Sequence, residues 1–417
     1  MTKQWKVKKL IDLCDVFADG DWIESKHQSS RGIRLIQTGN VGDGLFKDRA
    51  EKARYISEDT FRRLRCTEVF EGDCLISRLP DPVGRACILP DSGEKMITAV
   101  DCTIVRFKKS MLPQFFNYYS QSFNYLNDIE HETTGTTRKR ISRSKLGEVN
   151  IPVPSLPEQQ RIVSILDESF IAIASAKEKT EKSLRYSRDI FQAYLQNVFG
   201  NPSDGWKQKK LGEIAQHSLG KMLDRAKNRG SYKKYLRNLN VRWFEFDLSD
   251  LLEMRFRDEE QEQYTAVKGD ILICEGGYPG RAAIWNEDYP IHFQKAIHRV
   301  RFHTPEYNKW FLYFLYLSHL NRDIEKYFTG AGIQHFTGEA LDRFILPIAP
   351  VTEVKEITFK LDTLYVDTRK LEKVYQQKIR RTGKAKKSIL HKAFNGQLRG
   401  ELMNESASYR DGTCFRN

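Results

Sequence analysis

The chain has 417 residues, enough for two to four domains with separate cores. Hydrophobic residues make up 40% and charged residues 29%, which is typical of a globular protein and excludes wholesale disorder and a fibrous fold. The 68 Lys and Arg residues exceed the 55 Asp and Glu residues, so the formal net charge is +13. Such a charge suits a polyanion, most obviously nucleic acid; a basic protein without such a partner is the alternative.

No apolar stretch approaches the roughly 20 residues that a membrane-spanning helix requires, and the first residues lack the apolar region of a secretory signal. The seven cysteines are an odd number, and no two of them form a Cys-x-x-Cys pair. We therefore expect a cytoplasmic protein with buried free thiols and without a disulfide framework, a zinc site or a membrane partner.

The sequence repeats itself. Residues 5–13 return as residues 206–214, an offset of 201 (206 minus 5). Further landmarks recur in the same order in both halves: Gly72-Asp73 and Gly269-Asp270, Gly84-Arg85 and Gly280-Arg281, Arg106-Phe107 and Arg301-Phe302, and Leu166-Asp167 and Leu361-Asp362. A duplication of roughly 200 residues predicts approximate twofold symmetry, with two similar binding faces for partners that are themselves paired or symmetric.

The first part of each half alternates short strand-like segments with turn formers. Residues 32–36, 73–77 and 102–107 are rich in β-branched residues and bounded by Gly, Pro, Asp and Asn. Residues 112–129 have the length and aromatic content of one amphipathic helix, matched by residues 310–328 in the second half. We predict a compact α+β domain of about 150 residues that is present twice.

A long helix is predicted after the first domain. Residues 158–199 contain neither Pro nor Gly, follow the proline-bearing segment 151–157, and precede the stop signal Gly200-Asn201-Pro202. A helix of these 42 residues would be about 63 Å long. Its heptad steps fall on Ile162, Leu166, Ile173, Leu184, Phe191 and Val198.

The second long helix shows a clearer coiled-coil seam. Apolar spacing of 4, 3, 4, 3 and 4 residues joins Ile357, Leu361, Leu364, Thr368, Leu371 and Tyr375. Two such helices can pair antiparallel into a rod with one domain near each end; alternatively, each helix packs only on its own domain. Residues 378–399 carry eight Lys or Arg and no acid, which indicates either a contact with phosphates or an acidic partner surface, or simply a solvated face.

Common catalytic motifs are missing from the sequence. Absent are the phosphate-binding Gly-x-x-x-x-Gly-Lys-Ser/Thr, Gly-x-Gly-x-x-Gly, the Asp/Asn-Pro-Pro-aromatic motif of amino-group methyltransferases, a nuclease-like Pro-Asp with Glu-x-Lys, and His-Glu-x-x-His. His292 and His298 have no acid or nucleophile beside them, which favours a surface or structural role. We therefore predict that the chain is not an enzyme.

Polar residues that suit DNA recognition recur in corresponding segments. Arg and Lys match guanine edges and phosphates, whereas Asn and Gln match adenine. Segments 34–41 and 234–241 present such groups, and the basic loop 136–143 corresponds to the uncharged, glycine-containing loop 330–336. The alternative for Gly84-Arg85 and Gly280-Arg281 is a turn with a solvated arginine. The predicted DNA-binding residues are Arg34, Gln37, Thr38, Asn40, Arg78, Arg85, Thr136, Arg138, Lys139, Arg140, Arg143, Arg237, Asn238, Asn240, Arg242, Tyr278, Arg281, Gln294, Gln334 and His335.

Four segments carry a family resemblance. Residues 156–163 (LPEQQRIV) and 393–398 (AFNGQL) look like the conserved regions of type I restriction-modification specificity subunits (HsdS), and residues 235–241 and 269–277 resemble parts of that family's target-recognition domains. The resemblance covers residues 1 to about 400. Residues 351–357 depart from the Leu-Pro-Glu-Gln-Gln pattern of the first half, which weakens the prediction for that partner contact.

The resemblance implies an α+β protein with two target-recognition domains in a pseudo-twofold repeat, each followed by a long helix, the two helices forming an antiparallel coiled coil. The expected organisation is target-recognition domains at 1–155 and 201–350, helical regions at 156–200 and 351–400, and a disordered tail at 401–417.

The same resemblance implies a non-catalytic subunit that reads an asymmetric, interrupted double-stranded DNA target. It would bind two methyltransferase subunits and, with them, recruit ATP-dependent restriction subunits. No cofactor of its own is implied, because S-adenosylmethionine, ATP and Mg²⁺ would belong to the partners. The competing interpretations are a coiled-coil adaptor with nonspecific DNA affinity and an enzyme with an unrecognised active site.

Overall fold

The computed structural model describes residues 5–135, 138–224 and 226–398. The chain divides into two compact units: unit 1 comprises residues 1–181 and 377–417, and unit 2 comprises residues 182–376. Each unit holds one globular domain and a part of each of two long helices, α5 (Leu156–Gly200) and α10 (Val351–Phe394). In the part of the chain that the structure describes, no helix is both long and apolar enough to cross a membrane. The tail expected at 401–417 lies outside the described residues.

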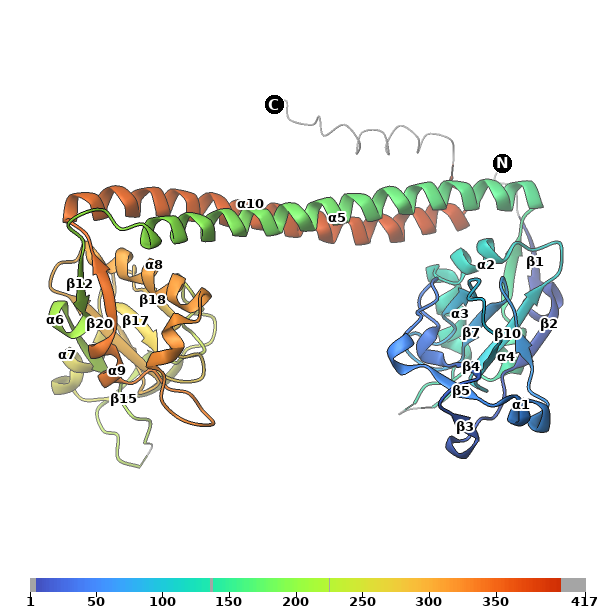
Figure 1. Cartoon of the computed structure of the whole chain (residues 1–417), viewed down its shortest axis with the longest axis horizontal. Helices are drawn as coiled ribbons and strands as arrows, with labels where there is room; N and C mark the ends of the chain where they lie inside the picture. The colour runs from blue at the N-terminus through green and yellow to red at the C-terminus, as the bar shows by residue number, and fades with distance from the viewer. Residues whose placement is uncertain (1–4, 136–137, 225, 399–417) are drawn as a thin grey trace, which may run out of the picture. The chain divides into compact units, whose positions relative to one another are not determined.

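The domain of unit 1 is built on three antiparallel or mixed sheets (Figure 1). In spatial order they are β1 (Lys6–Lys9) and β11 (Asn150–Val153); β2 (Cys14–Asp19), β10 (Cys102–Phe107), β7 (Cys74–Ser77) and β8 (Ala86–Ile88); and β3 (Gln28–Ser29), β5 (Arg54–Ile56), β4 (Ile33–Ile36), β9 (Met96–Thr98) and β6 (Glu68–Val69). The helices are α1 (Glu58–Leu64), α2 (Pro113–Tyr119), α3 (Phe123–Glu132) and α4 (Arg143–Gly147), with short 3₁₀ turns η1 (Ile11–Leu13), η2 (Ser25–His27), η3 (Thr38–Asn40) and η4 (Ala50–Lys52).

The domain of unit 2 repeats this topology. Its sheets are β12 (Lys207–Lys210) and β21 (Ile345–Ile348); β13 (Ala215–Leu219), β20 (Ile297–Phe302), β17 (Ile271–Cys274) and β18 (Ala282–Ile284); and β15 (Leu252–Phe256), β14 (Ser231–Leu236), β19 (Ile291–Phe293) and β16 (Thr265–Ala266). The helices are α6 (Leu211–Ile214), α7 (Gln261–Tyr264), α8 (Tyr307–Leu320) and α9 (Gly338–Arg343), with η5 (Asp258–Glu260) and η6 (Asp323–Tyr327). The predicted duplication of an α+β domain is therefore confirmed, strand for strand in the central sheet.

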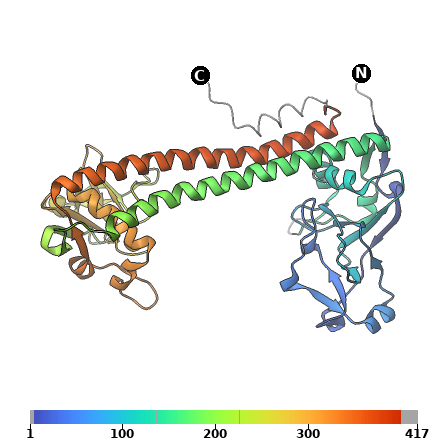
Figure 2. The ribbon, with the colours of Figure 1, turned by 45° about the horizontal axis from the view of Figure 1, so that its top comes forward.

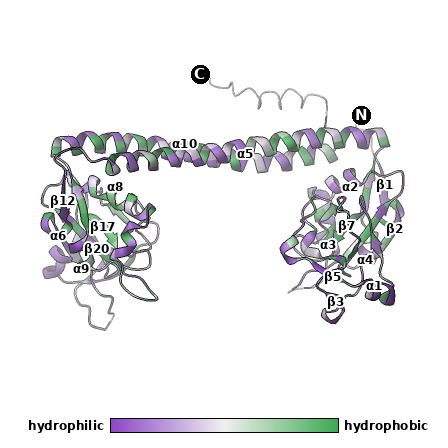
Figure 3. Cartoon of the chain, in the orientation of Figure 1, coloured by the Kyte–Doolittle hydropathy of each residue, from purple (hydrophilic) through white to green (hydrophobic). Residues whose placement is uncertain are grey.

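The central strand of each domain is buried on both faces. In β7, Cys74 and Ile76 pack into the core beneath α2 and α3, while Leu75 faces a second core beside β4 and β9. In β17, Ile271 and Ile273 face one core and Leu272 the other. Figure 3 shows the apolar residues concentrated on these inner strands. A run of apolar residues without alternation is what a strand covered on both sides requires.

The predicted single helix over 112–129 is wrong, because two helices occupy this segment in unit 1. The chain breaks after α2, where the Ser122 hydroxyl accepts a hydrogen bond from Tyr125 N at 3.3 Å and caps the start of α3. In unit 2 the matching segment also divides, into α8 and η6, with Arg322 at a left-handed φ of 64° between them. Serine competes well for the backbone donors at a helix start, and this local signal overrides the continuous amphipathic pattern.

The two long helices pack antiparallel, as predicted (Figures 1 and 2). In unit 1 the Lys386 ammonium lies 5.0 Å from the centre of the Phe170 ring. In unit 2 Arg188 Nε donates to Glu372 Oε1 at 2.6 Å. The first part of α5 therefore packs against the last part of α10 in unit 1, and the last part of α5 packs against the first part of α10 in unit 2. The predicted seam holds except at Leu371, which is 44% exposed while Glu372 beside it is buried by its pair with Arg188.

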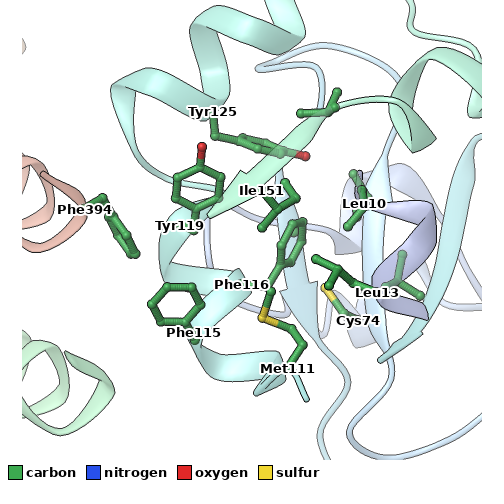
Figure 4. Close-up of a cluster of buried hydrophobic side chains, with 14 of the residues drawn as sticks. Leu10, Leu13, Cys74, Met111, Phe115, Phe116, Tyr119, Tyr125, Ile151 and Phe394 are labelled. Atoms are coloured by element: carbon green, nitrogen blue, oxygen red, sulfur yellow. The ribbon is translucent and has the colours of Figure 1, made fainter. Parts of the chain in front are cut away.

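A hydrogen bond between a tyrosine and an aspartate also joins each long helix to a domain. The Tyr118 hydroxyl donates to Asp167 on α5, and the Tyr313 hydroxyl donates to Asp362 on α10 at 2.7 Å. The end of α10 packs on unit 1 as well, where the Phe394 ring lies 5.5 Å from that of Phe115 (Figure 4). The helices therefore pack both on each other and on the domains, and the repeated Leu-Asp landmark marks an anchor point.

Candidate nucleic-acid interface

The turns that follow β4 and β14 are held by equivalent asparagines. Asn40 Oδ1 accepts from Gln37 N at 2.9 Å, and its Nδ2 donates to the carbonyls of Lys47 and Asp48. Asn240 repeats the arrangement, accepting from Arg237 N at 2.8 Å and donating to two carbonyls of the following loop. Both amides are used by the backbone, so these two predicted DNA-binding residues fix the shape of their turns.

The repeated Gly-Arg pairs fix the same turns from the other side. Arg85 is buried and donates to the carbonyls of Thr38, Val41, Leu79 and Pro82 at 2.7–3.0 Å. Arg281 keeps the bond to the corresponding carbonyl, Asn238 O, at 2.8 Å. The interpretation of a turn with a solvated arginine is therefore half right: Gly84 and Gly280 adopt a left-handed φ of 83°, but Arg85 is not solvated.

Three further predicted arginines are engaged in ion pairs. Arg34 is buried against Asp48, Arg78 is buried against Asp19 at 3.2 Å, and Arg237 pairs with Asp250 at 2.6 Å. A buried guanidinium needs such a partner, because an uncompensated charge is costly to desolvate. These side chains support the loops and do not project from them.

One ion pair is repeated in both domains, directly before β7 and directly before β17. Arg106 holds Asp73 through two bonds of 2.8 and 2.7 Å, and Arg301 holds Asp270 through two bonds of 2.7 Å. Bidentate pairs of this kind fix a carboxylate with high geometric precision. They explain why the Gly-Asp and Arg-Phe landmarks recur in both halves.

Corresponding hairpins carry the most divergent polar residues. Thr134 pairs with Arg140 in unit 1, and Thr329 pairs with His335 in unit 2. A left-handed glycine opens each turn, Gly135 at φ 99° and Gly330 at φ 104°. The two hairpins thus share the pairing at their base and the glycine after it, but their described exposed side chains differ.

The hairpin of unit 1 and the helix after it are basic and exposed. Arg138, Lys139, Arg140 and Arg143 are all exposed, and three of them are near acids: Lys139 pairs with Glu130, Arg140 with Asp101 at 2.8 Å, and Arg143 lies 3.9 Å from Asp19. Exposed pairs of this kind are weak and can exchange an acid for a phosphate. Thr136 lies outside the described residues, and Gln37 and Thr38 are half-buried on the η3 turn.

In unit 2 several predicted residues form one surface. The Asn238 side chain donates to Gly276 O at 3.0 Å, Gly276 pairs with His335, and the Arg281 guanidinium lies 3.8 Å from the centre of the Tyr278 ring. Gln334 is exposed beside His335. Of the other predicted residues, Arg242 bonds the Leu239 carbonyl and pairs with Asp247, and Gln294 is half-buried in a backbone bridge with Lys221.

The sequence analysis missed two apolar members of this surface, Leu239 and Ile333, both exposed. Both are apolar, whereas base edges and phosphates are bound mainly by polar groups. A large apolar residue, Ile333, in a turn otherwise made of Gly, Ala, Gln and His was the available signal.

Burial keeps several thiols and two histidines of the described chain uncharged at neutral pH. Burial raises the pKa of the Cys14, Cys87 and Cys102 thiols to about 12, so these thiols stay protonated at neutral pH. Burial lowers the pKa of His292 and His298 to about 4, in keeping with a structural role for both. No group of three or more His, Cys, Asp or Glu residues within the described ranges could hold a metal ion.

Comparisons with known proteins agree on one family. The family model described as type I restriction modification DNA specificity domain matches residues 2–184 and again residues 203–381. The chain is 23% identical over 338 residues to the type I restriction enzyme EcoKI specificity subunit of Escherichia coli K12, covering 75% of this chain and 71% of that protein. It is 21% identical over 332 residues to the StySPI specificity subunit of Salmonella potsdam, with the same coverage of 75% and 71%.

Two solved structures share the fold. One is a chain of a structure that describes complex assembly and conformational transition of the type I R-M system. It superposes with a TM-score of 0.76 at 16% identity, covering 95% of this chain and 98% of that chain. The HsdS subunit from Thermoanaerobacter tengcongensis gives a TM-score of 0.59 at 17% identity, with the same coverage.

Proposed function

Because the chain belongs to the family of type I restriction-modification specificity subunits, we propose that its two domains each read one half of an interrupted double-stranded DNA target. Unit 1 would read one half-site and unit 2 the other. The chain itself would recognise DNA and would not catalyse a reaction. Methyl transfer and cleavage would belong to partner subunits that carry S-adenosylmethionine, ATP and Mg²⁺.

One observation supports this proposal above the others. Residues that fix turns are equivalent in the two domains, as with Asn40 and Asn240 or Asp73 and Asp270. The residues exposed on the corresponding hairpins are not: Arg138 and Lys139 in unit 1 stand where Ile333 and Gln334 stand in unit 2. Shared supports with different exposed chemistry are expected of two readers of different DNA sequences.

The repeated helix anchors support paired partners. Since Tyr118–Asp167 and Tyr313–Asp362 hold α5 and α10 to their domains in the same way, each unit presents a similar combination of helix and domain. Two copies of a methyltransferase subunit could dock on such equivalent faces, and restriction subunits would join this assembly.

The test uses the full chain together with its methyltransferase. Mapping methylated adenines in the host genome gives the target sequence and its spacer, and a duplex with that sequence should bind at least a thousandfold more tightly than a scrambled duplex. Equal affinity for both duplexes at physiological salt would instead favour a coiled-coil adaptor with nonspecific DNA affinity.

A further inference from the structure

Unit 2 presents apolar side chains on the loops that would face DNA. Ile333 at the hairpin tip is 73% exposed, Tyr278 is 51% exposed, and Leu239 is 49% exposed. Single exposed apolar residues are common, but several on neighbouring loops of one surface indicate a contact site.

Backbone and side-chain contacts join these loops into one surface. His335, two residues after Ile333, pairs with Gly276, whose carbonyl accepts the Asn238 side chain. Arg281 stacks on Tyr278 and donates to the carbonyl of Asn238, next to Leu239. The hairpin, the 275–281 loop and the turn after β14 therefore hold one another in place.

The hairpin is fixed by its own contacts. Gly330 is required at its turn, because a Cβ atom there would lie 2.3 Å from the Ile333 carbonyl oxygen. At its base Phe336 is fully buried, its ring lies 5.7 Å from that of Phe328, and its N–H donates to Glu275 O at 2.7 Å. These contacts order the backbone at the base and the turn of the hairpin, so little backbone entropy would be lost when Ile333 makes a contact.

The hairpin of unit 1 carries a residue of different chemistry at the position of Ile333. Gly135 makes the same turn, since its Cβ atom would lie 2.6 Å from the Arg138 carbonyl oxygen, so Arg138 corresponds to Ile333. One hairpin offers a cation at this point and the other offers a branched alkyl group. Gln334, the exposed neighbour of Ile333, offers an amide of the kind that binds base edges, and the loop that carries Tyr278 and Arg281 is joined to the hairpin through the pairing of Gly276 with His335.

We infer that Ile333 is a specificity-determining residue that contacts the 5-methyl group of a thymine in the half-site read by unit 2. In the major groove thymine is the standard base that carries a methyl group, and the adenine paired with it offers the N6 and N7 atoms that an Asn or Gln amide binds. This inference rests on the proposed function, and it adds the chemistry by which one domain selects an A·T pair.

The test removes the methyl group from the DNA and the alkyl group from the protein. Each thymine of the mapped target is replaced in turn by deoxyuridine, and binding is measured with the full chain in complex with its methyltransferase. One replacement in the half-site of unit 2 should weaken binding about fourfold, the value for one buried methyl group. The Ile333→Ala variant should bind the thymine and deoxyuridine duplexes equally.

A matched control comes from unit 1, where the β-branched Val7 on β1 is 60% exposed. The Val7→Ala variant should keep the full thymine dependence, and the thermal unfolding of Ile333→Ala should match that of the unchanged protein. If deoxyuridine weakens binding equally with and without Ile333, or weakens neither, while sequence-specific binding persists, the inference is overturned and the proposed function stands. Loss of methyltransferase assembly in Ile333→Ala with unchanged thymine dependence would overturn it in favour of a protein contact. Absence of any preference for the mapped duplex would overturn both.

Discussion

The two domains differ least where their side chains point inward and most where they point outward. Asn40 and Asn240 each make three hydrogen bonds of the same kind, and Asp73 and Asp270 each accept two hydrogen bonds from an arginine. On the corresponding hairpins, by contrast, the exposed residues of unit 1 are basic, whereas those of unit 2 are apolar or carry an amide. The repeat therefore keeps the buried contacts that fix its turns while the exposed side chains of its hairpins change.

The largest test of this comparison exchanges one domain. Replacing residues 206–350 by the corresponding domain of another specificity subunit should change only the half-site assigned to unit 2, with affinity for the original target falling by about a thousandfold. Methylated-adenine mapping reads out both halves at once. A change in both half-sites would show that the two domains do not read independently.

A second test separates two residues that occupy equivalent positions. Arg85→Met should lower the free energy of unfolding by about 3 kcal/mol, because four carbonyl groups lose a charged donor. Arg281→Met should cost about 1 kcal/mol, because it removes the bond to Asn238 O. Urea unfolding measures both, and similar losses would mean that Arg281 is as structural as Arg85.

A third test uses pH. Burial, with a further contribution from His217, lowers the pKa of His298 to about 4, whereas an unfolded histidine titrates near about 6.5. Between these two pKa values the unfolded chain binds more protons than the folded chain. The free energy of unfolding of unit 2 is therefore highest above this pH window and falls by about 2 kcal/mol by pH 5. The His298→Leu variant should lose less stability on acidification.

Unit 1 provides the control for this pH effect. Thr103 pairs with Ile76 where His298 pairs with Ile273, so β10 has no titrating group at this position. Hydrogen exchange at pH 7 and pH 5 should therefore show faster opening of β20 than of β10 on acidification. Equal acceleration of both strands would assign the pH effect to other groups.

The smallest expected effect concerns salt. Lys139→Ala should reduce the slope of log affinity against log salt by at most about 1, because one phosphate contact is lost and Lys139 already has Glu130 as a neighbour. Gln334→Ala in the corresponding hairpin should leave the slope unchanged. A larger change from Gln334 than from Lys139 would contradict the contrast between the two hairpins.

The repeat made most of the fold predictable. Offsets between halves located the central strands, and heptad spacing identified the paired helices, because both patterns report burial that recurs along the chain. The division of 112–129 into two helices was missed because its signals are local: Ser122 caps α3 in unit 1, and Arg322 with a left-handed φ breaks the matching segment of unit 2. Local capping of this kind competes with a long amphipathic pattern, and the pattern alone does not show which prevails.

The candidate interface was less predictable, because residue type does not show direction. Arg85 and Arg138 have the same donors, yet one is buried among carbonyls and the other is exposed at a hairpin. Repetition itself was the missed clue: a polar residue that is kept in both halves, such as Asn40 and Asn240, supports the loop. On the hairpins, where Arg138 corresponds to Ile333, the residues that differ between the halves are exposed.

The short ladders at the edge of each domain have a consequence for how such proteins diversify. Lys9 pairs with Asn150 and Lys210 pairs with Ile345, so each domain begins and ends at neighbouring points. A segment with adjacent ends can be excised and replaced as a cassette without redirecting the chain on either side. Recombination at these two ladders could supply a new reading domain in a single event, while the helices that follow them stay unchanged.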